Sequence, residues 1–177
     1  KGIASDHYLG EIFGGGIIFW LTPDRQHGLI ASLRDIDNGE GIAWSNITEV
    51  EIGLNARNMT NGLAIIEAII TQNGHLMSAA KLCADYVVDG FSDWYLPSDR
   101  ELILLASQDY LIDNILDNDN NPETAGFMQE YNPPTYGSYW SSTEGSAAYS
   151  WVFDFGYGGI YDVTKNLTYR VRAIRKF

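Results

Sequence analysis

Short β-prone runs separated by glycines near the C-terminal end most constrain the fold. They cover residues 150–155, 159–164 and 169–174 and contain much Tyr, Val, Ile and Phe, residue types that favour strands. The glycines between them permit tight turns, so we expect consecutive strands to pair antiparallel. No long alternation of strands and helices precedes them, which disfavours a parallel doubly wound sheet.

Two apolar runs near the N-terminus predict a hairpin. Residues 17–21 and 28–31 flank a Thr-Pro-Asp turn signal, and such runs are typical of paired, buried strands. The glycine run at 14–16 precedes the first strand and is not followed by Gly-Lys-Ser/Thr, which argues against a phosphate-binding loop. We expect His27, at the exit of the turn, to hydrogen-bond turn backbone rather than to act as a catalytic base.

Helical spacing of apolar residues occurs twice in the middle of the chain, in residues 58–72 and 76–88. Cys83 falls on the apolar face of the second segment, so we expect it to be a buried small hydrophobe rather than a catalytic thiol. A further helix should begin at Ser98, because Glu101 completes a capping box. These patterns predict an α+β chain with two or three helices and antiparallel β-sheets.

Length and charge limit the class of protein. With 177 residues and 45% hydrophobic content, the chain can bury one core, and we expect a single domain over residues 1–177. The formal net charge of -12 disfavours a nucleic-acid partner, since phosphate contacts need clustered Lys and Arg. The longest apolar run is too short to cross a bilayer, so we expect no membrane span in this chain, and no signal peptide is recognisable.

Residues that could carry catalysis or bind metal lack a recognisable arrangement. The three histidines lie far apart, without metal-ligand spacing. We expect Asp93, which lies among aromatic residues, to be a buried acceptor for local backbone donors. The Asp- and Asn-rich segment 113–123 suggests calcium, but Pro122 occupies the position of the EF-hand glycine. A solvated loop is favoured there, and a shallow oxygen-ligand site stays open. We expect no enzyme activity, no cofactor and no metal site.

Several sequence blocks occur together in a characteristic order. They are Gly-Gly-Ile-Ile-Phe-Trp (15–20), Gln-His-Gly-Leu (26–29), Gly-Phe-Ser-Asp-Trp-Tyr-Leu-Pro-Ser (90–98), Tyr-Trp-Ser-Ser-Thr-Glu (139–144) and Arg-Val-Arg-Ala-Ile-Arg (170–175). In this combination the chain resembles the Lcl C-terminal domain family, named for part of a bacterial collagen-like adhesin and related to C-type lectin-like folds. The resemblance implies a C-type lectin-like α+β fold with paired N- and C-terminal strands, in which loops carry the function.

Functions known from related folds are carried over only in part. The Glu-Pro-Asn and Trp-Asn-Asp motifs of calcium-dependent lectins are absent. An enzyme of the formylglycine-generating branch stays an alternative, although that branch uses a cysteine pair and this chain has only Cys83. The family also suggests an adhesin that binds sulfated polysaccharides. Such binding would depend on four cations, namely Arg170, Arg172, Arg175 and Lys176. These could instead belong to a paired terminal strand whose charges are satisfied inside the domain.

Residues 145–169 are a candidate variable region. Apart from Trp151 and Lys165, this segment contains no Lys, Glu, Gln, Met or Trp. Some relatives resemble variable proteins of diversity-generating retroelements, in which randomised adenines of AAC or AAT codons yield only residues with pyrimidine-ending codons. Every other residue of the segment belongs to that set. Strands and turns also favour Tyr, Val, Ile, Gly and Asp, so both explanations stay open.

The candidate ligand contacts are residues of this region that combine aromatic area with adaptable hydrogen bonding. They are Tyr149, Val152, Asp154, Tyr157, Tyr161, Asp162, Thr164, Asn166, Thr168 and Tyr169. Strand alternation predicts that Val152 and Asp154 point outward while Trp151, Phe153 and Phe155 point into the core. Tyr157 and Tyr161, next to glycines, are the strongest recognition candidates.

The sequence therefore predicts a non-enzymatic, adhesin- or receptor-type domain. Its expected location is a cell surface, a virion surface or the extracellular space, which is inferred from the family resemblance. The expected partner is a protein or glycan on another cell or particle, recognised through residues 145–169. A structural subunit of a surface fibre and formation of a homo-oligomer stay open.

Overall fold

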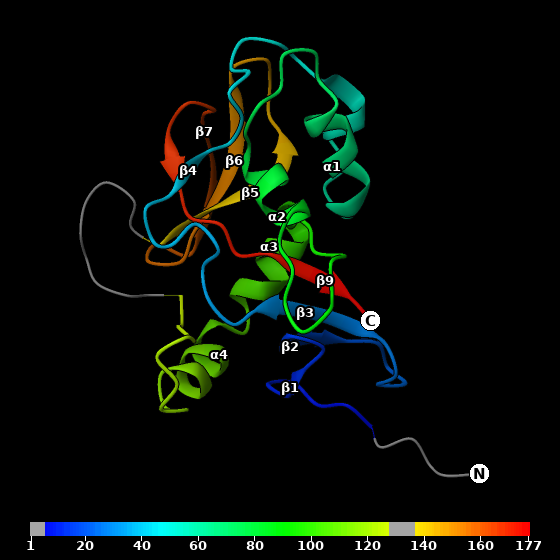
Figure 1. The fold of residues 1–177 in the computed structure, drawn as a ribbon, viewed down its shortest axis with the longest axis vertical. Helices are drawn as coiled ribbons and strands as arrows, with labels where there is room; N and C mark the ends of the chain where they lie inside the picture. Colours follow the sequence, from blue (N-terminus) through cyan, green and yellow to red (C-terminus); the bar gives the residue numbers. More distant parts are fainter. Residues whose placement is uncertain (1–5, 128–136) are drawn as a thin grey trace.

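The computed structural model describes residues 6–127 and 137–177 (Figure 1). Residues 1–5 and 128–136 of the expected domain lie outside the described residues. The elements are β1 (Ile12–Phe13), β2 (Gly16–Leu21), β3 (Gly28–Ser32), β4 (Ile42–Ala43), the 3-10 helix η1 (Gly53–Ala56), α1 (Leu63–Ile70), α2 (Ala79–Ala84), α3 (Asp99–Ala106), α4 (Asp109–Leu116), β5 (Ser138–Glu144), β6 (Tyr149–Asp154), β7 (Gly159–Thr164), β8 (Thr168–Tyr169) and β9 (Ile174–Lys176).

One sheet joins the two ends of the chain, with strand order β1-β2-β3-β9. Strands β2 and β3 form the predicted hairpin, and β9 pairs antiparallel with β3, which confirms the expected pairing of N- and C-terminal strands. Close strand packing explains the glycine at the start of β2, because a Cβ atom on Gly16 would lie 2.2 Å from the carbonyl oxygen of Ala31. A larger residue there would push the two strands apart.

A second sheet is built from the late β-prone runs, in the order β5-β6-β7, and lies above the first sheet in Figure 1. All its pairings are antiparallel. The predicted strand over 169–174 is only partly correct, because it divides into β8, which pairs with β4 in a separate two-stranded sheet, and β9 of the first sheet. Between them Arg170 forms a bridge to Tyr139 of β5, so the chain passes beside the second sheet on its way from β8 to β9.

The α+β class is confirmed, with four α-helices among the described residues instead of two or three. The additional helix, α4, occupies the first part of the segment expected to be a solvated loop. The predicted helix over 76–88 is shorter than expected, because α2 ends at Ala84 and Leu76 and Val87 are exposed outside it. Helical spacing at these two positions was coincidental.

The predicted start of α3 is confirmed and is tied to a distant helix. The backbone N–H of Ser98 donates to Glu101 Oε2 at 2.9 Å. The same carboxylate accepts the Gly62 N–H at 2.8 Å and the Tyr95 hydroxyl at 2.9 Å. Glu101 is buried, and several donors to one buried carboxylate offset its loss of hydration. This side chain therefore fixes the start of α3 against the start of α1.

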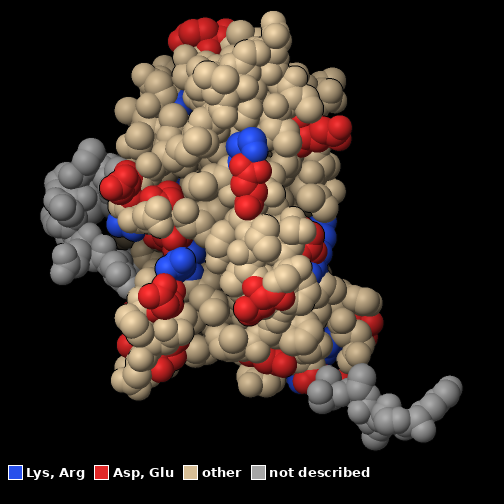
Figure 2. All heavy atoms as spheres, viewed as in Figure 1, with Lys and Arg blue, Asp and Glu red and all other residues tan. Residues whose placement is uncertain are grey.

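The molecular surface shown in Figure 2 carries scattered acidic side chains, and most of its few Lys and Arg side chains lie beside Asp or Glu. None of the described helices combines the length and apolarity that a bilayer-spanning helix needs. The basic surface that phosphate backbones need is not visible on this face.

Candidate functional site

The turn between β6 and β7 presents the most exposed aromatic side chain of the candidate region. Tyr157 lies at this turn and is 87% exposed. The carboxylate of Asp154 accepts the Tyr157 N–H at 2.8 Å, and the Asp154 carbonyl accepts the Gly158 N–H at 2.8 Å. Gly158 has a φ of 68°, a conformation that glycine adopts without strain. Asp154 thus fixes the turn, while the Tyr157 ring stays accessible to solvent.

Two further tyrosines lie close to this turn, Tyr161 in β7 of the second sheet and Tyr169 in β8 of the two-stranded sheet that β8 forms with β4. The hydroxyl of Tyr161 lies 3.1 Å from Ser138 Oγ and 3.4 Å from Asp154 Oδ2. The ring of Tyr169 packs edge-on against Trp140 with centroids 5.0 Å apart. Partial burial raises the pKa of Tyr161 and of Tyr169, so both hydroxyls stay protonated at neutral pH. We call Tyr157, Tyr161 and Tyr169 the tyrosine face.

The predicted outward orientation of Val152 and Asp154 is wrong. Val152 is 0% exposed and Asp154 is buried, while Trp151, expected in the core, is half-buried. In the first half of β6 the alternation is present but reversed, because Tyr149 is exposed and Trp151 half-buried while Ser150 and Val152 are buried. From Val152 to Asp154 every side chain is buried. Asp154 supports the turn and the Tyr161 hydroxyl instead of contacting a ligand.

The remaining candidates of β6 and β7 lie on the opposite face of this sheet. Tyr149 is paired with Thr164, and Trp151 with Asp162, whereas Tyr161 is paired with Val152. Directly paired residues share a face and successive residues alternate, so Asp162 and Tyr161 point to opposite sides. The structure therefore divides the predicted contacts into two groups that one small ligand cannot contact together.

Asn166 lies in the connection between β7 and β8, and Thr168 is the first residue of β8. Both side chains are exposed. Thr168 is paired with Ala43 of β4, next to Tyr169 of the tyrosine face. These two residues lie at the border of the tyrosine face rather than at its centre.

A buried ion pair stabilises the connection between β7 and β8. Lys165 is fully buried, and its Nζ lies 2.7 Å from Glu144 Oε1 at the end of β5. Lys165 Nζ also donates to the Ala147 carbonyl at 2.8 Å, and Glu144 accepts the N–H groups of Ile52 and Gly53 at the start of η1. Lys165 and Glu144 were not predicted as functional residues. The only signal in the sequence was that Lys165 is an exception to the composition of its segment.

The C-terminal arginines are engaged inside the domain. Arg170 and Arg172 both form ion pairs with Asp35, with N–O distances of 2.9 and 2.8 Å. Arg172 is buried and also donates to backbone carbonyls, including that of Gly126 at 2.9 Å. These guanidinium groups therefore stabilise the fold, and a sulfated polysaccharide would find few free cations here.

Asp93 is not the buried backbone acceptor that the sequence suggested. Its side chain is exposed and its carboxylate forms two hydrogen bonds to Arg175, at 2.7 and 3.0 Å. This bond to Arg175 lowers the pKa of Asp93. The side chain therefore anchors β9, and its lowered pKa does not suit a general acid.

Two side chains that the sequence analysis weighed as catalytic groups, Cys83 and His27, have structural surroundings in the fold. Cys83 is fully buried, as predicted, and burial raises the pKa of its thiol well above the usual value. His27 Nδ1 lies 3.3 Å from the carbonyl oxygen of Phe177, so its partner is the backbone of the last residue rather than the turn. Within residues 6–127 and 137–177 no cluster of three His, Cys, Asp or Glu side chains could hold a metal ion.

The acidic segment 113–123, which begins in the last turn of α4, uses its carboxylates as acceptors for backbone N–H groups. Asp113 Oδ1 accepts the Phe127 N–H at 2.6 Å, and Asp117 Oδ1 accepts the Gly126 N–H at 3.0 Å. Asp119 accepts the Asn121 N–H at 2.7 Å. Each of these bonds closes a local loop, so the Asp and Asn content of this segment has a structural explanation.

Comparison with known proteins adds one finding. The family model described as the Lcl C-terminal domain matches residues 36–175. This range extends from just after β3 into β9 and includes all ten candidate contacts. No curated protein matches the chain.

Proposed function

Because this chain belongs to the Lcl C-terminal domain family, we propose that it is a non-enzymatic binding domain that recognises a protein or glycan through the tyrosine face. The observation that carries this proposal is Tyr157, an almost fully exposed aromatic ring on a turn anchored by Asp154. A single exposed ring is common on protein surfaces, but Tyr157 lies near Tyr161 and Tyr169, and a group of exposed aromatic side chains is typical of an interaction site. A surface of this kind suits an adhesin or receptor located outside the cell or on a virion.

The chemistry of the tyrosine face supports recognition over catalysis. Tyrosine rings supply contact area with few rotatable bonds, and their hydroxyl groups add hydrogen bonds. The hydroxyl of Tyr161 is already oriented by Ser138 and Asp154, so little conformational entropy is lost on binding. The rings could stack on a sugar or fill a pocket of a protein surface.

We also propose that residues 145–169 are diversified by a retroelement. The two exceptions to the pyrimidine-ending codon set are Trp151 and Lys165, and Lys165 holds a buried ion pair. Trp151 is half-buried, and its indole nitrogen would lie 3.5 Å from a Cβ atom on Gly145. Structural positions need a fixed residue, whereas Tyr157 and Asp162 could vary without loss of the fold.

Sequencing the encoding locus tests this second proposal. A near-copy of the codons for residues 139–175 should lie nearby and differ only at template adenines. The Trp151 codon, TGG, contains no adenine and should be identical in the copy. Differences at other template bases would contradict diversification and leave the binding proposal untouched.

The binding proposal is tested by screening the folded domain on a glycan array and against displayed surface proteins, and then measuring the affinity of each hit. Tyr157→Ala should weaken binding at least about tenfold, as for aromatic hot spots. Tyr110→Ala is the matched control, because Tyr110 is 84% exposed on α4 and lies outside the tyrosine face. Both variants should unfold at nearly the wild-type temperature.

The two faces of the second sheet can be separated in the same assay. Asp162→Ala removes an exposed side chain from the face opposite Tyr161 and should leave the affinity unchanged. If Asp162→Ala abolishes binding while Tyr157→Ala does not, the ligand contacts the opposite face and the assignment of the tyrosine face is wrong. Equal effects of Tyr157→Ala and Tyr110→Ala would likewise contradict it.

A further inference from the structure

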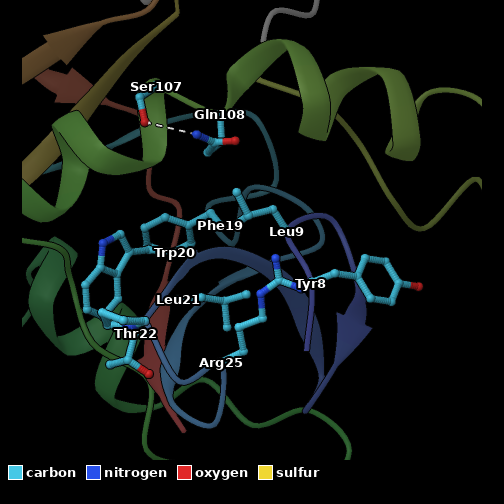
Figure 3. A pocket seen from close by; sticks show the side chains of 10 residues that line it. Tyr8, Leu9, Phe19, Trp20, Leu21, Thr22, Arg25, Ser107 and Gln108 are labelled. Carbon is cyan, nitrogen blue, oxygen red and sulfur yellow. Dashed lines mark hydrogen bonds between the residues drawn. The ribbon is translucent and has the colours of Figure 1, made fainter. Parts of the chain in front are cut away.

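Two neighbouring hollows share one exposed tryptophan on the first sheet, far from the tyrosine face in the chain. One has a volume of about 490 Å³ and the other of about 360 Å³, and Trp20 lines both. Trp20 is 37% exposed. Figure 3 shows the larger hollow, with the Trp20 ring along one side and Ser107 and Gln108 above it. We call the two hollows together the Trp20 groove.

Sheet register and one helix explain why this groove is open and partly apolar. Trp20 is paired with Leu29, and Leu29 with Lys176, so the three side chains form a row on one face of the sheet. Leu104 of α3 lines the smaller hollow with Trp20. Helix α3 packs against β2 through this part of the molecule but leaves Trp20 and Leu104 partly exposed.

The cations around the groove differ from the other described cations of this acidic chain in their ion pairing. Seven Lys and Arg side chains of the described residues form ion pairs with carboxylates. The other three, Arg25, Arg100 and Lys176, form none with a described carboxylate. Arg25 lines the larger hollow. Lys176 lines the smaller one together with Glu101, whose carboxylate already accepts hydrogen bonds from Gly62, Tyr95 and Ser98. Arg100 is exposed on α3, four residues before Leu104 and so on the same face of the helix.

We infer that the Trp20 groove is a second docking site, for an acidic peptide segment of a partner protein that carries a large apolar side chain. The apolar side chain would pack against Trp20 and Leu104, and the acidic residues would lie beside Arg25, Arg100 and Lys176. Cations without carboxylate partners attract an acidic segment even though the whole domain is negative, because screening limits charge interactions to about 10 Å.

Other anionic partners fit this groove less well. A membrane or a nucleic acid presents an extended negative surface, which a net charge of -12 repels. The affinity for a phosphate backbone depends mainly on how many phosphates the protein neutralises, and three cations neutralise few. A narrow peptide instead enters a groove and contacts the cations and the tryptophan together.

Selection of a phage-displayed random peptide library on the wild-type domain tests the proposal. Recovered peptides should be rich in Asp and Glu around a large apolar residue. Trp20→Ala should weaken their binding at least about tenfold, and Lys176→Gln should weaken it less and reduce its salt dependence. Matched controls are Tyr149→Ala, an exposed aromatic on the other sheet, and Lys81→Gln, which removes one positive charge from α2.

The outcomes are distinct. The proposal is overturned if no peptide is enriched, if the enriched peptides lack acidic residues, or if they bind Trp20→Ala and wild type equally. Trp20-dependent binding to phosphatidylserine vesicles without peptide enrichment would assign the groove to a membrane instead. Should Trp20→Ala unfold, Leu104→Ala and Trp20→Phe provide the same test, with Leu104→Ala weakening binding and Trp20→Phe retaining most of it.

Discussion

Replacing Lys165 by Met should destabilise the domain more than any exposed substitution in residues 145–169. Methionine has a similar length but no charge, so Glu144 would remain as a buried carboxylate without its cation. Glu144 would keep its bonds from the Ile52 and Gly53 N–H groups, and the carbonyls of Val50 and Ala147 would each lose a donor.

The size of this effect follows from the burial of both partners, which are 0% exposed. Removing one partner of a buried ion pair costs about 3–5 kcal/mol, because the other charge stays buried and uncompensated. Total unfolding free energies of domains are typically about 5–15 kcal/mol. Lys165→Met should therefore lose a large fraction of the stability, whereas an exposed substitution such as Asp162→Ala should change it by about 0.5 kcal/mol or less.

Urea unfolding followed by tryptophan fluorescence measures the free energy for Lys165→Met, Glu144→Gln and the double variant. The double variant should be more stable than the sum of the single losses predicts, since it removes both charges. Purely additive losses, or a cost below about 1 kcal/mol for Lys165→Met, would refute the claim that this pair holds the connection after β7.

Two further predictions concern buried ionisable groups. Burial raises the pKa of Asp99 from 3.8 to about 6, so the folded state favours the protonated carboxyl. The free energy of unfolding should therefore fall by on the order of 3 kcal/mol as the pH rises from about 4 to about 6. Urea titrations of Asp99→Asn should show a smaller fall over this range, and an equal fall would contradict the assignment. Cys83 should react with a thiol reagent only slowly in native protein and rapidly in urea, because its thiol is buried and its pKa is raised; fast native labelling would reopen the enzyme alternative.

Local sequence signals predicted the elements whose causes are local. The hairpin of β2 and β3 followed from two apolar runs around a Thr-Pro-Asp turn, and α3 from the Ser98 and Glu101 capping box. The same signals misjudged the ends of α2 and the segment occupied by α4. A helical pattern of apolar residues does not by itself show where tertiary packing stops supporting the helix.

The candidate site was predicted only at its exposed turn. Glycines around Tyr157 correctly indicated an exposed turn, whereas Tyr161 lies in β7 and is only 38% exposed. The orientation of Val152 and Asp154 was wrong, because period-two alternation separates the two faces of a strand but does not say which face meets the core. Nothing in the sequence alone shows that Tyr149 and Trp151 lie on the outer face of β6, or that Val152, Phe153 and Asp154 are all buried.

The sequence by itself determined the α+β class, the antiparallel pairing of late strands, the burial of the single cysteine and the family, because these depend on periodicity, turn chemistry and recurring motifs. Tertiary structure alone decided which long-range partners satisfy each buried charge. Lys165 pairs with Glu144, and Arg172 pairs with Asp35, although the partners are not neighbours in the sequence. Such pairs arise when packing removes water from a charge, so that only a partner brought close by the fold can replace its hydration.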